Sequence, residues 1–358
     1  MTLAQKPNPG GSQIMRDDVY YIGLDIHKRI VAYCLKTDAG EIVDEGTLDA
    51  RRSALSGWAD LIDRPWIGAM EATMFTGWVY DLLEPRTVEL KVGNPQKIKA
   101  ICSGKKKSDR IDAATLADLL RVDMIPECYM APQWMRELRR TLRYRNFLVR
   151  HNTALKNRAA GVLMELGVEY DGDRLHGKRY FAELLGDLED DAKSAIPILR
   201  FNHEAMRTFD RTQRTLTAGL ERHERLAERV ARLRTIPGVG PILALTWALE
   251  IGDPHRFSAI RKAVSYCGLS SRFISSAGIV KRAPLSKQRN AHLQWALIEV
   301  AKLAPRFNAQ LAEVKERTLG KGANRNQATL AVARKLVAYL MAVDKSGQPF
   351  EATERPAA

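Results

Sequence analysis

The strongest constraint on the fold is the order of elements predicted by the first 130 residues. Short apolar runs typical of strands lie at 20–26, 30–35 and 41–46, with short polar turns between them. Two further apolar runs, at 66–70 and 88–92, alternate with helical patterns that begin near residues 53, 77, 95 and 109. A three-strand meander followed by alternating helices and strands favours α/β packing around one central sheet.

This order of strands and helices is that of an RNase H-like domain, which we expect over residues 19–130. A fold alone does not establish chemistry, so the side chains at the strand ends must decide the function. The polar ends of the chain, residues 1–18 and 344–358, are expected to be disordered tails.

A basic helical region follows, which we expect to form a coiled coil over residues 131–233. Between positions 134 and 160 the chain has eight basic residues and one acidic residue. Leu148, Leu155 and Val162 are spaced by seven, and apolar positions recur over 216–230, so two long helices are expected to pack antiparallel. A solvated helix face is one interpretation of the charge and phosphate contact is the other, which the asymmetry favours. The residues expected to contact nucleic acid are Arg136, Arg139, Arg140 and Arg143.

A mostly helical C-terminal region is expected over residues 234–343. It begins with the sequence IPGVGP at 236–241, followed by an apolar helix at 242–251. The segment resembles a helix-hairpin-helix, in which Gly238 and Gly240 would let backbone N–H groups approach a phosphate. A purely packing role for the same turn stays open.

Charge and cysteine usage narrow the classes of partner. Fifty-six basic and 42 acidic residues give a net charge of +14, which favours a polyanion such as nucleic acid. The four cysteines form no CxxC pair, which argues against zinc and a disulfide framework. The longest apolar run, 241–249, is too short for a membrane span, and no hydrophobic signal segment is seen, so we expect a cytoplasmic, nucleoid-associated protein without a membrane partner.

Four carboxylates have the positions needed for a metal site. Asp25 lies near the end of the first strand and Glu71 just after the run at 66–70, while Asp109 and Asp112 start a helix on one face. Together they would repel unless one or two Mg²⁺ ions bind, and such a cluster supports two-metal phosphoryl transfer. Each acid also has an ordinary explanation as a cap or surface charge. For His27 a structural role is favoured over contact with a metal-bound phosphate.

Two basic segments accompany possible reactive groups. Next to the acidic pair, three lysines either attract phosphates or form a solvated loop: Lys105, Lys106 and Lys107. A Ser/Gly-rich loop at 274–278 precedes Lys281 and Lys287, which could activate a serine nucleophile. Without further context, Ser275 and Ser276 are ordinary loop residues.

An ordered set of motifs resembles a known family. The segments are GLDIHK, MEAT, KKKSDRIDA, IPGVGP, GL…SSAG and SKQRN, within residues 20 to 342. They resemble the DEDD insertion-sequence transposases of the IS110 type, which are bridge-RNA-guided recombinases. The resemblance implies a RuvC-like N-terminal domain, a linking coiled coil and a C-terminal transposase domain with a nucleophilic serine.

The resemblance also implies roles for particular residues. The four acids Asp25, Glu71, Asp109 and Asp112 would bind Mg²⁺ and take part in catalysis. Ser276 would attack DNA to form a covalent phosphoserine link, with Ser275 as the alternative if the alignment slips by one residue. The implied partners are donor and target DNA, a structured noncoding guide RNA that pairs with both, and further copies of the chain in dimers that pair into a tetramer.

Two positions depart from the family pattern. Ala277 stands where glycine usually follows the serine, and Arg289 replaces the glycine of the usual Lys-x-Gly-Asn. The favoured hypothesis is an RNA-guided recombinase that excises and integrates insertion sequences by Mg²⁺-dependent serine transesterification. Its rivals are a hydrolytic, junction-resolving nuclease with a structural serine and a noncatalytic nucleic-acid scaffold.

Overall fold

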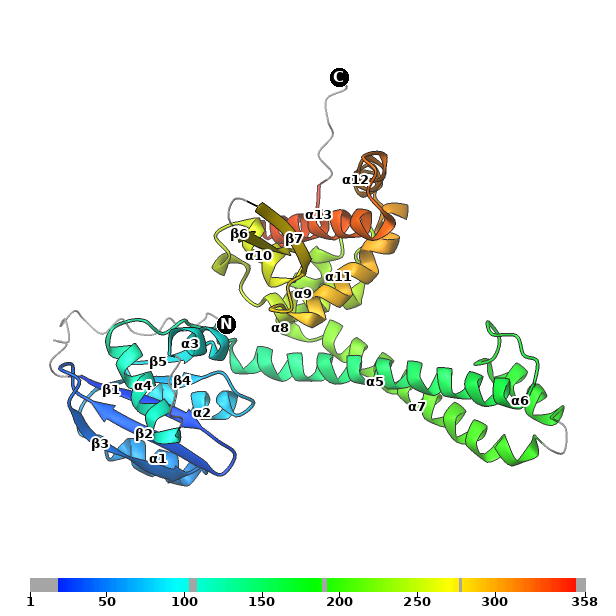
Figure 1. Ribbon diagram of the computed structural model, residues 1–358. Helices are drawn as coiled ribbons and strands as arrows, with labels where there is room; N and C mark the ends of the chain where they lie inside the picture. Colours follow the sequence, from blue (N-terminus) through cyan, green and yellow to red (C-terminus); the bar gives the residue numbers. More distant parts are fainter. Residues whose placement is uncertain (1–18, 103–107, 189–191, 277–278, 352–358) are drawn as a thin grey trace, which may run out of the picture. The chain divides into compact units, whose positions relative to one another are not determined.

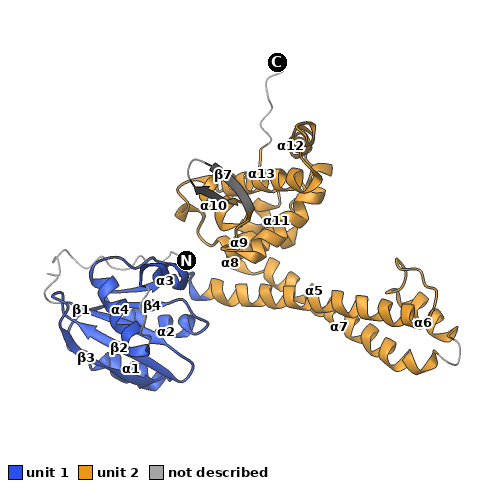
Figure 2. Cartoon of the chain, viewed as in Figure 1, with its two compact units in different colours: residues 1–133 blue, residues 134–358 orange. Residues whose placement is uncertain are grey.

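The computed structural model describes residues 19–102, 108–188, 192–276 and 279–351, with the backbone alone at 272–276 and 279–283. The chain divides into two compact units, one up to Gln133 and one from Trp134 onward (Figure 2). Residues 134–343 fall in the second unit, and their predicted division into a coiled-coil region and a C-terminal domain at residue 234 stays a prediction.

The first unit is built on a five-stranded mixed sheet (Figure 1). Its strands are β1 (Tyr20–Ile26), β2 (Ile30–Lys36), β3 (Ile42–Asp49), β4 (Trp66–Glu71) and β5 (Glu89–Gly93), in the order β3-β2-β1-β4-β5. The meander β1-β2-β3 is antiparallel, whereas β4 pairs parallel with both β1 and β5. This confirms the predicted α/β domain with a central sheet and agrees with the expected RNase H-like order.

Helices cover both faces of this sheet: α1 (Arg52–Asp60), α2 (Thr76–Leu83), α3 (Pro95–Ile101) and α4 (Asp109–Arg121). On one face, Ile22 and Leu24 of β1 pack with Leu55 of α1 and Val79 of α2. On the other, Tyr21 packs with residues of α3 and α4 such as Ile98 and Leu116. The period of two in β1 thus sends alternate side chains into two separate cores.

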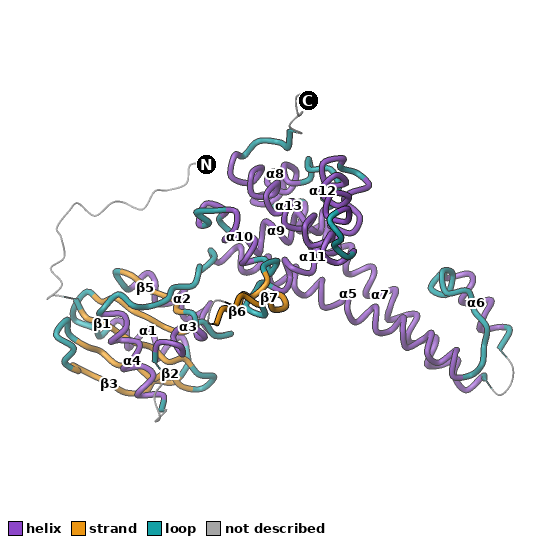
Figure 3. Tube along the Cα trace, turned by 45° about the horizontal axis from the view of Figure 1, so that its top comes forward, coloured by secondary structure: helices purple, strands orange, loops and turns teal. Residues whose placement is uncertain are grey.

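The second unit begins with a helical arm of two long helices and one short helix, drawn as purple coils in Figure 3. It consists of α5 (Gln133–Glu165), α6 (Lys178–Gly186) and α7 (Ile196–Glu221). Leu163 of α5, Phe181 of α6 and Leu199 of α7 share one core, and Asn152 donates a 2.6 Å hydrogen bond to Asp210. The long helices agree with the expected helical region, whereas their coiled-coil packing stays a prediction.

The second of the two predicted helices is interrupted. The repeat over 216–230 is divided between α7 and α8 (Glu224–Leu233), because His223 has an extended backbone and its Nδ1 accepts a hydrogen bond from the Arg225 backbone. The prediction of one continuous helix was therefore wrong here. A side chain that caps a helix can end an apolar repeat that otherwise continues.

The rest of the second unit packs around α9 (Pro241–Ile251), which is buried from Leu243 to its end. Helices α8 and α11 (Ala291–Leu303) contact α9, and α13 (Arg325–Ser346) contacts both α8 and α11. The remaining elements are α10 (Ile260–Tyr266), the antiparallel pair β6 (Ser271–Ser276) and β7 (Ile279–Leu285), and α12 (Ala309–Gly320). Among the described residues, no helix is long and apolar enough to cross a membrane.

Helix α13 extends into the polar segment predicted as a tail from residue 344. The Asp344 side chain is 3% exposed and forms an ion pair of 2.6 Å with Arg229. It also accepts a hydrogen bond of 2.9 Å from the Trp247 indole. The start of this polar segment is therefore part of the core, because the charge of Asp344 is paired there.

Candidate active site

Asp25 and Glu71 lie at the same edge of the sheet because of the register of two parallel strands. Leu24 of β1 pairs with Met70 of β4, and the two acids are the next residues of their strands. Residues in register on parallel strands share a face of the sheet. Asp25 also lies on the same face as Gly23, which is the face that α4 covers.

The close approach of α4 depends on Gly23. A Cβ atom at this position would lie 2.0 Å from the Ala113 carbonyl oxygen and 2.6 Å from the Ala117 backbone nitrogen. A side chain here would therefore have to push α4 away from β1. This glycine opens the GLDIHK motif, but no local sequence pattern predicts its contact with α4.

The start of α4 supplies the other two acids. Ser108 caps the helix by accepting a 3.3 Å hydrogen bond from the Ile111 backbone, which places Asp109 and Asp112 in the first turn. His27 Nε2 lies 3.1 Å from Asp25 Oδ2 and 3.4 Å from Asp109 Oδ1. Residues far apart in sequence thus meet at the edge of the sheet.

The closest cluster contains Asp25, His27 and Asp109. Each offers one ligand atom, and these atoms all lie within 4.8 Å of one another. In the part of the chain that the structure describes, Glu71 and Asp112 stand outside this cluster. His27, which the sequence favoured as a structural residue, contacts both carboxylates, and its place two residues after Asp25 is the signal that could have indicated this.

The electrostatics of Asp25 indicate a need for positive charge. Its side chain is only 15% exposed, and this burial raises the pKa of the carboxyl. The nearby His27 lowers the pKa, whereas the charges of Asp109 and Asp112 raise it further. A hard divalent cation fits this set of carboxylate oxygens, because it stabilises several acids at once.

The serine segment has a different local structure from the expected loop. Ser275 and Ser276 belong to strand β6, with Ser275 opposite Val280 and Ser276 opposite Ile279 of β7. Ser276 is thus the last residue of its strand. Lys281 lies in β7 opposite Ile274, and Lys287 is exposed in the segment before α11. The predicted lysines Lys105, Lys106 and Lys107 lie outside the described residues.

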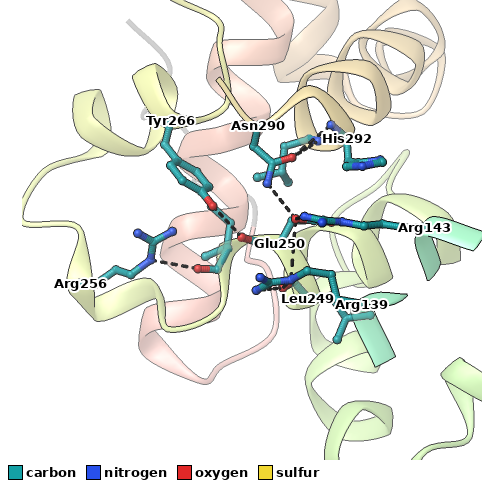
Figure 4. Close-up of polar contacts among 10 residues, drawn as sticks. Arg139, Arg143, Leu249, Glu250, Arg256, Tyr266, Asn290 and His292 are labelled. Carbon is teal, nitrogen blue, oxygen red and sulfur yellow. Dashed lines mark hydrogen bonds and ion pairs between the residues drawn. The ribbon is translucent and has the colours of Figure 1, made fainter. Parts of the chain in front are cut away.

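Two of the four predicted phosphate-binding arginines are engaged inside the second unit (Figure 4). Arg143 of α5 forms two 2.8 Å hydrogen bonds with the carboxylate of Glu250 in α9. Arg139 donates to the Leu249 carbonyl at 2.9 and 2.7 Å. Both side chains thus attach α5 to α9, whereas Arg140 is exposed and Arg136 half-buried.

Glu250 is the centre of this polar cluster and is 1% exposed. Burial by itself raises the pKa of Glu250, but hydrogen bonds and charge from Arg143, with help from Asn290 and Arg139, lower it below its ordinary value. Asn290, the last residue of the SKQRN motif, donates to Glu250 at 2.8 Å and caps α11 by accepting from the His292 and Leu293 backbones. This motif residue therefore positions α11.

The departure at Arg289 is accommodated by a neighbouring glycine. Gly268 has φ of +73°, and a Cβ atom there would lie 2.6 Å from the Arg289 side chain. Arg289 also donates a 3.1 Å hydrogen bond to the Ser286 carbonyl. The Arg289 side chain therefore lies over Gly268 and stays close to the backbone of Ser286.

The two glycines of the IPGVGP turn differ in their surroundings. Gly238 has φ of +93°, and a Cβ atom there would lie 2.9 Å from that of Ala304. Gly240 is the N-cap of α9 with φ of −87°, and no described atom would lie within 4 Å of its Cβ. Gly238 therefore has a packing role, whereas the space beside Gly240 at the start of α9 is free of described atoms.

The fold and these motifs define a protein with an acidic sheet edge and a mostly helical second unit. Comparison with known proteins identifies the class of protein that has these features. A model of DEDD transposases of the IS110 type matches residues 22–167, and one of the IS116/IS110/IS902 transposase family matches residues 230–316. Together these matches cover more than half of the chain. The protein belongs to the IS110/IS116 family of transposases, and so to the DNA-recombining enzymes.

Three relatives illustrate the range of the family. The chain is 25% identical to the transposase for insertion sequence element IS1111A of Coxiella burnetii, over 84% of this chain and 80% of the relative. It is 27% identical to a probable family 20 transposase of Pseudomonas aeruginosa, over 71% and 76%. The pilin gene-inverting protein of Moraxella bovis is 31% identical over 35% of this chain and 40% of its own length.

Proposed function

We propose that this protein is an RNA-guided recombinase that excises and integrates an insertion sequence through a covalent serine–DNA intermediate. The observation that carries the proposal is the convergence of Asp25, His27 and Asp109 at one edge of the sheet. Glu71 ends the neighbouring strand β4, and Asp112 lies in the same first turn of α4 as Asp109. The names of relatives, an insertion-sequence transposase and a gene-inverting protein, support recombination over simple hydrolysis.

The acids would hold one or two Mg²⁺ ions, with Asp25 and Asp109 as the nearest pair of oxygen ligands. When bound, such an ion stabilises the negative charge that develops at a phosphate and its leaving oxygen. His27 would hold the carboxylates of Asp25 and Asp109 in place, because it contacts both. Burial of Asp25 strengthens all of these interactions.

Ser276 would be the nucleophile. Its Oγ forms a bond to the phosphorus of the cleaved strand while the bond from phosphorus to a sugar oxygen breaks. In net terms the serine proton ends on the departing sugar hydroxyl, and the energy of the phosphodiester bond is kept in the protein–DNA link. Ser276 would act from the end of β6, where its backbone pairs with Ile279 of β7.

The remaining parts of the proposal concern partners. A structured guide RNA would pair with donor and target DNA, so that base pairing selects the site and the protein contacts the backbone. The basic helix α5, the turn before α9 acting as a helix-hairpin-helix, and the lysines at 105–107, 281 and 287 would supply phosphate contacts. Dimers that pair into a tetramer, with a coiled coil between domains, complete the proposed assembly.

The test is a search for the covalent adduct. The protein is incubated with Mg²⁺, the RNA transcribed from the flank of the element, and end-labelled DNA, and the products are separated under denaturing conditions. We expect a labelled protein band with the wild type and the Ser275→Ala control. Ser276→Ala should abolish the band, and Asp109→Asn should reduce it at least about tenfold because a ligand is lost.

Other outcomes would replace the proposal. Mg²⁺-dependent cleavage without an adduct would assign a hydrolytic nuclease with a structural serine. An adduct that persists in Ser276→Ala and disappears in Ser275→Ala would move the nucleophile by one residue. Equal yields with and without RNA would remove the guide from the mechanism.

A further inference from the structure

One face of α5 carries a row of exposed side chains that no contact described above uses. It consists of residues 140, 144, 147, 151, 154 and 158, all exposed and spaced alternately by four and three. This spacing places residues on a single stripe of a helix. Its centre is aromatic, with Tyr144 54% and Phe147 42% exposed, followed by His151. Arg140 and Arg158 stand at its two ends, and we call this row the aromatic stripe.

The rings of the aromatic stripe are arranged as a continuous surface. Tyr144 and Phe147 stack with ring centroids 5.8 Å apart and planes at 17°. Phe147 and His151 follow with centroids 4.0 Å apart and planes at 57°. A helix rises about 10 Å from Tyr144 to His151, which matches about three base-to-base steps along one stacked strand.

The aromatic stripe is not part of the core of the arm. The residues that α5 buries, such as Leu142, Leu148 and Asn152, occupy other positions of the helix. Neighbouring aromatic rings left exposed on one face are typical of a binding surface rather than of chance exposure. The aromatic stripe therefore fits a ligand that has flat apolar faces.

The charges on the aromatic stripe favour a nucleic acid over a second copy of the chain. Between residues 138 and 164 the sequence has no acidic residue. Two identical stripes packed in parallel would place Arg140 against Arg140, and packed antiparallel they would place Arg140 against Arg158. Either arrangement opposes like charges, which costs free energy. Phosphates flanking a stack of bases would instead pair with both arginines.

We propose that the aromatic stripe binds an unpaired RNA segment, whose bases stack on Tyr144, Phe147 and His151 and whose phosphates contact Arg140 and Arg158. Unpaired RNA is favoured because the bases of a duplex are already stacked on one another, whereas loops of a structured RNA offer free base faces. The inference rests on the proposed function only in requiring an RNA partner, and it assigns a place where that partner is held.

The experiment measures binding by the full-length protein in EDTA at one fixed salt concentration, followed by fluorescence anisotropy of labelled strands. The strands are a short oligouridine, an abasic RNA of equal length, and oligothymidine DNA. The test variant carries Tyr144→Ala and Phe147→Ala, which preserve the helix because alanine is a strong helix former. Phe147→Trp is the conservative variant, and Phe201→Ala removes a 68% exposed aromatic side chain from α7 as a matched control.

We expect the double variant to bind oligouridine at least about fivefold more weakly, since stacking on each lost ring contributes to affinity. Binding of the abasic strand should change little, and Phe147→Trp and Phe201→Ala should bind like the wild type. An equal loss on oligouridine and abasic RNA would overturn the proposal, as would no loss on either.

Two further results would also contradict it. If oligothymidine binds more tightly than oligouridine and loses as much affinity in the double variant, the stripe serves single-stranded DNA and not RNA. If the double variant changes the sedimentation of the protein but not its RNA affinity, the stripe is a contact between copies. The assay contains no Mg²⁺ and requires no strand exchange. Its outcome for RNA binding is therefore independent of whether the proposed recombinase chemistry is correct.

Discussion

Asp25 is a partly buried carboxylate and Glu250 a fully buried one, and their surroundings have opposite effects on the pKa. Burial raises the pKa of both, but Asp25 has Asp109 and Asp112 nearby, whereas Glu250 is held by Arg143, Asn290 and Arg139. The Asp25 carboxyl is left with a raised pKa and the Glu250 carboxyl with a lowered one. The first environment favours an added cation, and the second is already neutralised by the protein itself. The two acids therefore serve binding and architecture respectively.

Replacing Glu250 with glutamine tests this assignment through the pH dependence of stability. The folded state lowers the pKa of Glu250, so its contribution is present above the unfolded-state pKa and is lost as the pH falls through the folded-state pKa. We expect Glu250→Gln to lower the free energy of unfolding by about 2 kcal/mol at pH 7, since Arg143 is half exposed and keeps part of its hydration. The difference from the wild type should shrink in acid.

Chemical denaturation at several pH values measures this effect. Glu299→Gln is the control, because Glu299 forms an exposed pair of 2.7 Å with Lys302. Its removal should change stability by less than about 0.5 kcal/mol. A loss for Glu250→Gln that stays constant down to the lowest pH would show that the charge of Glu250 does not matter.

At the scale of elements, the seating of α4 on β1 decides whether the acids meet. Helix α4 brings Asp109 to the sheet edge only because Gly23 allows its backbone to approach. The same face of β1 holds Gly23 and Asp25, so packing and site geometry depend on one contact. A change in this contact should therefore affect both stability and metal affinity.

Gly23→Ala is expected to destabilise the first unit by about 3 kcal/mol, because the new methyl group overlaps the Ala113 carbonyl. It should also weaken Mg²⁺ binding measured by calorimetry, since α4 must move away from Asp25. Gly57→Ala is the matched control: no described atom would lie within 4 Å of its Cβ, and alanine favours the helix α1. Unchanged Mg²⁺ affinity in a folded Gly23→Ala variant would disprove the dependence of the site on α4.

The turn before α9 offers a second matched pair of variants. Gly238→Ala should lower the melting temperature, because Gly238 has φ of +93° and faces Ala304. Gly240→Ala should cost at most about 1 kcal/mol, since its backbone conformation is ordinary and alanine is only a poorer N-cap. If the turn binds phosphate, Gly240→Ala nevertheless weakens DNA binding in a filter-binding assay. Normal DNA binding by Gly240→Ala would leave the turn with a packing role alone.

At the scale of the whole molecule, the two compact units have separate cores. Residues such as Ile22 and Leu24 form the core of the first, while α9 and its neighbours form that of the second. Calorimetry should therefore resolve two unfolding transitions, with Gly23→Ala lowering one and Glu250→Gln lowering the other. A single transition shifted equally by both variants would show that the units unfold together.

Much of the first unit follows from local sequence pattern. Short apolar runs in β1 and β2 predict the strands, and the order of strands and helices predicts the α/β sheet that β1 to β5 form. The positions of Asp25 and Glu71 could also be predicted because apolar runs end there, and those of Asp109 and Asp112 because a helical pattern begins there. These features depend on neighbours along the chain, which the sequence contains directly.

Other features depend on contacts that no local pattern encodes. The ion pair of Arg143 with Glu250 joins α5 and α9, and the basic run alone could not distinguish this arginine from the exposed Arg140. Likewise, His223 divides the expected helix, and Gly23 sets the approach of α4. The sequence by itself determined the kinds of element and the residue types at their ends. Only the tertiary structure decided which charges are neutralised inside and which face solvent, because burial depends on distant segments that pack together.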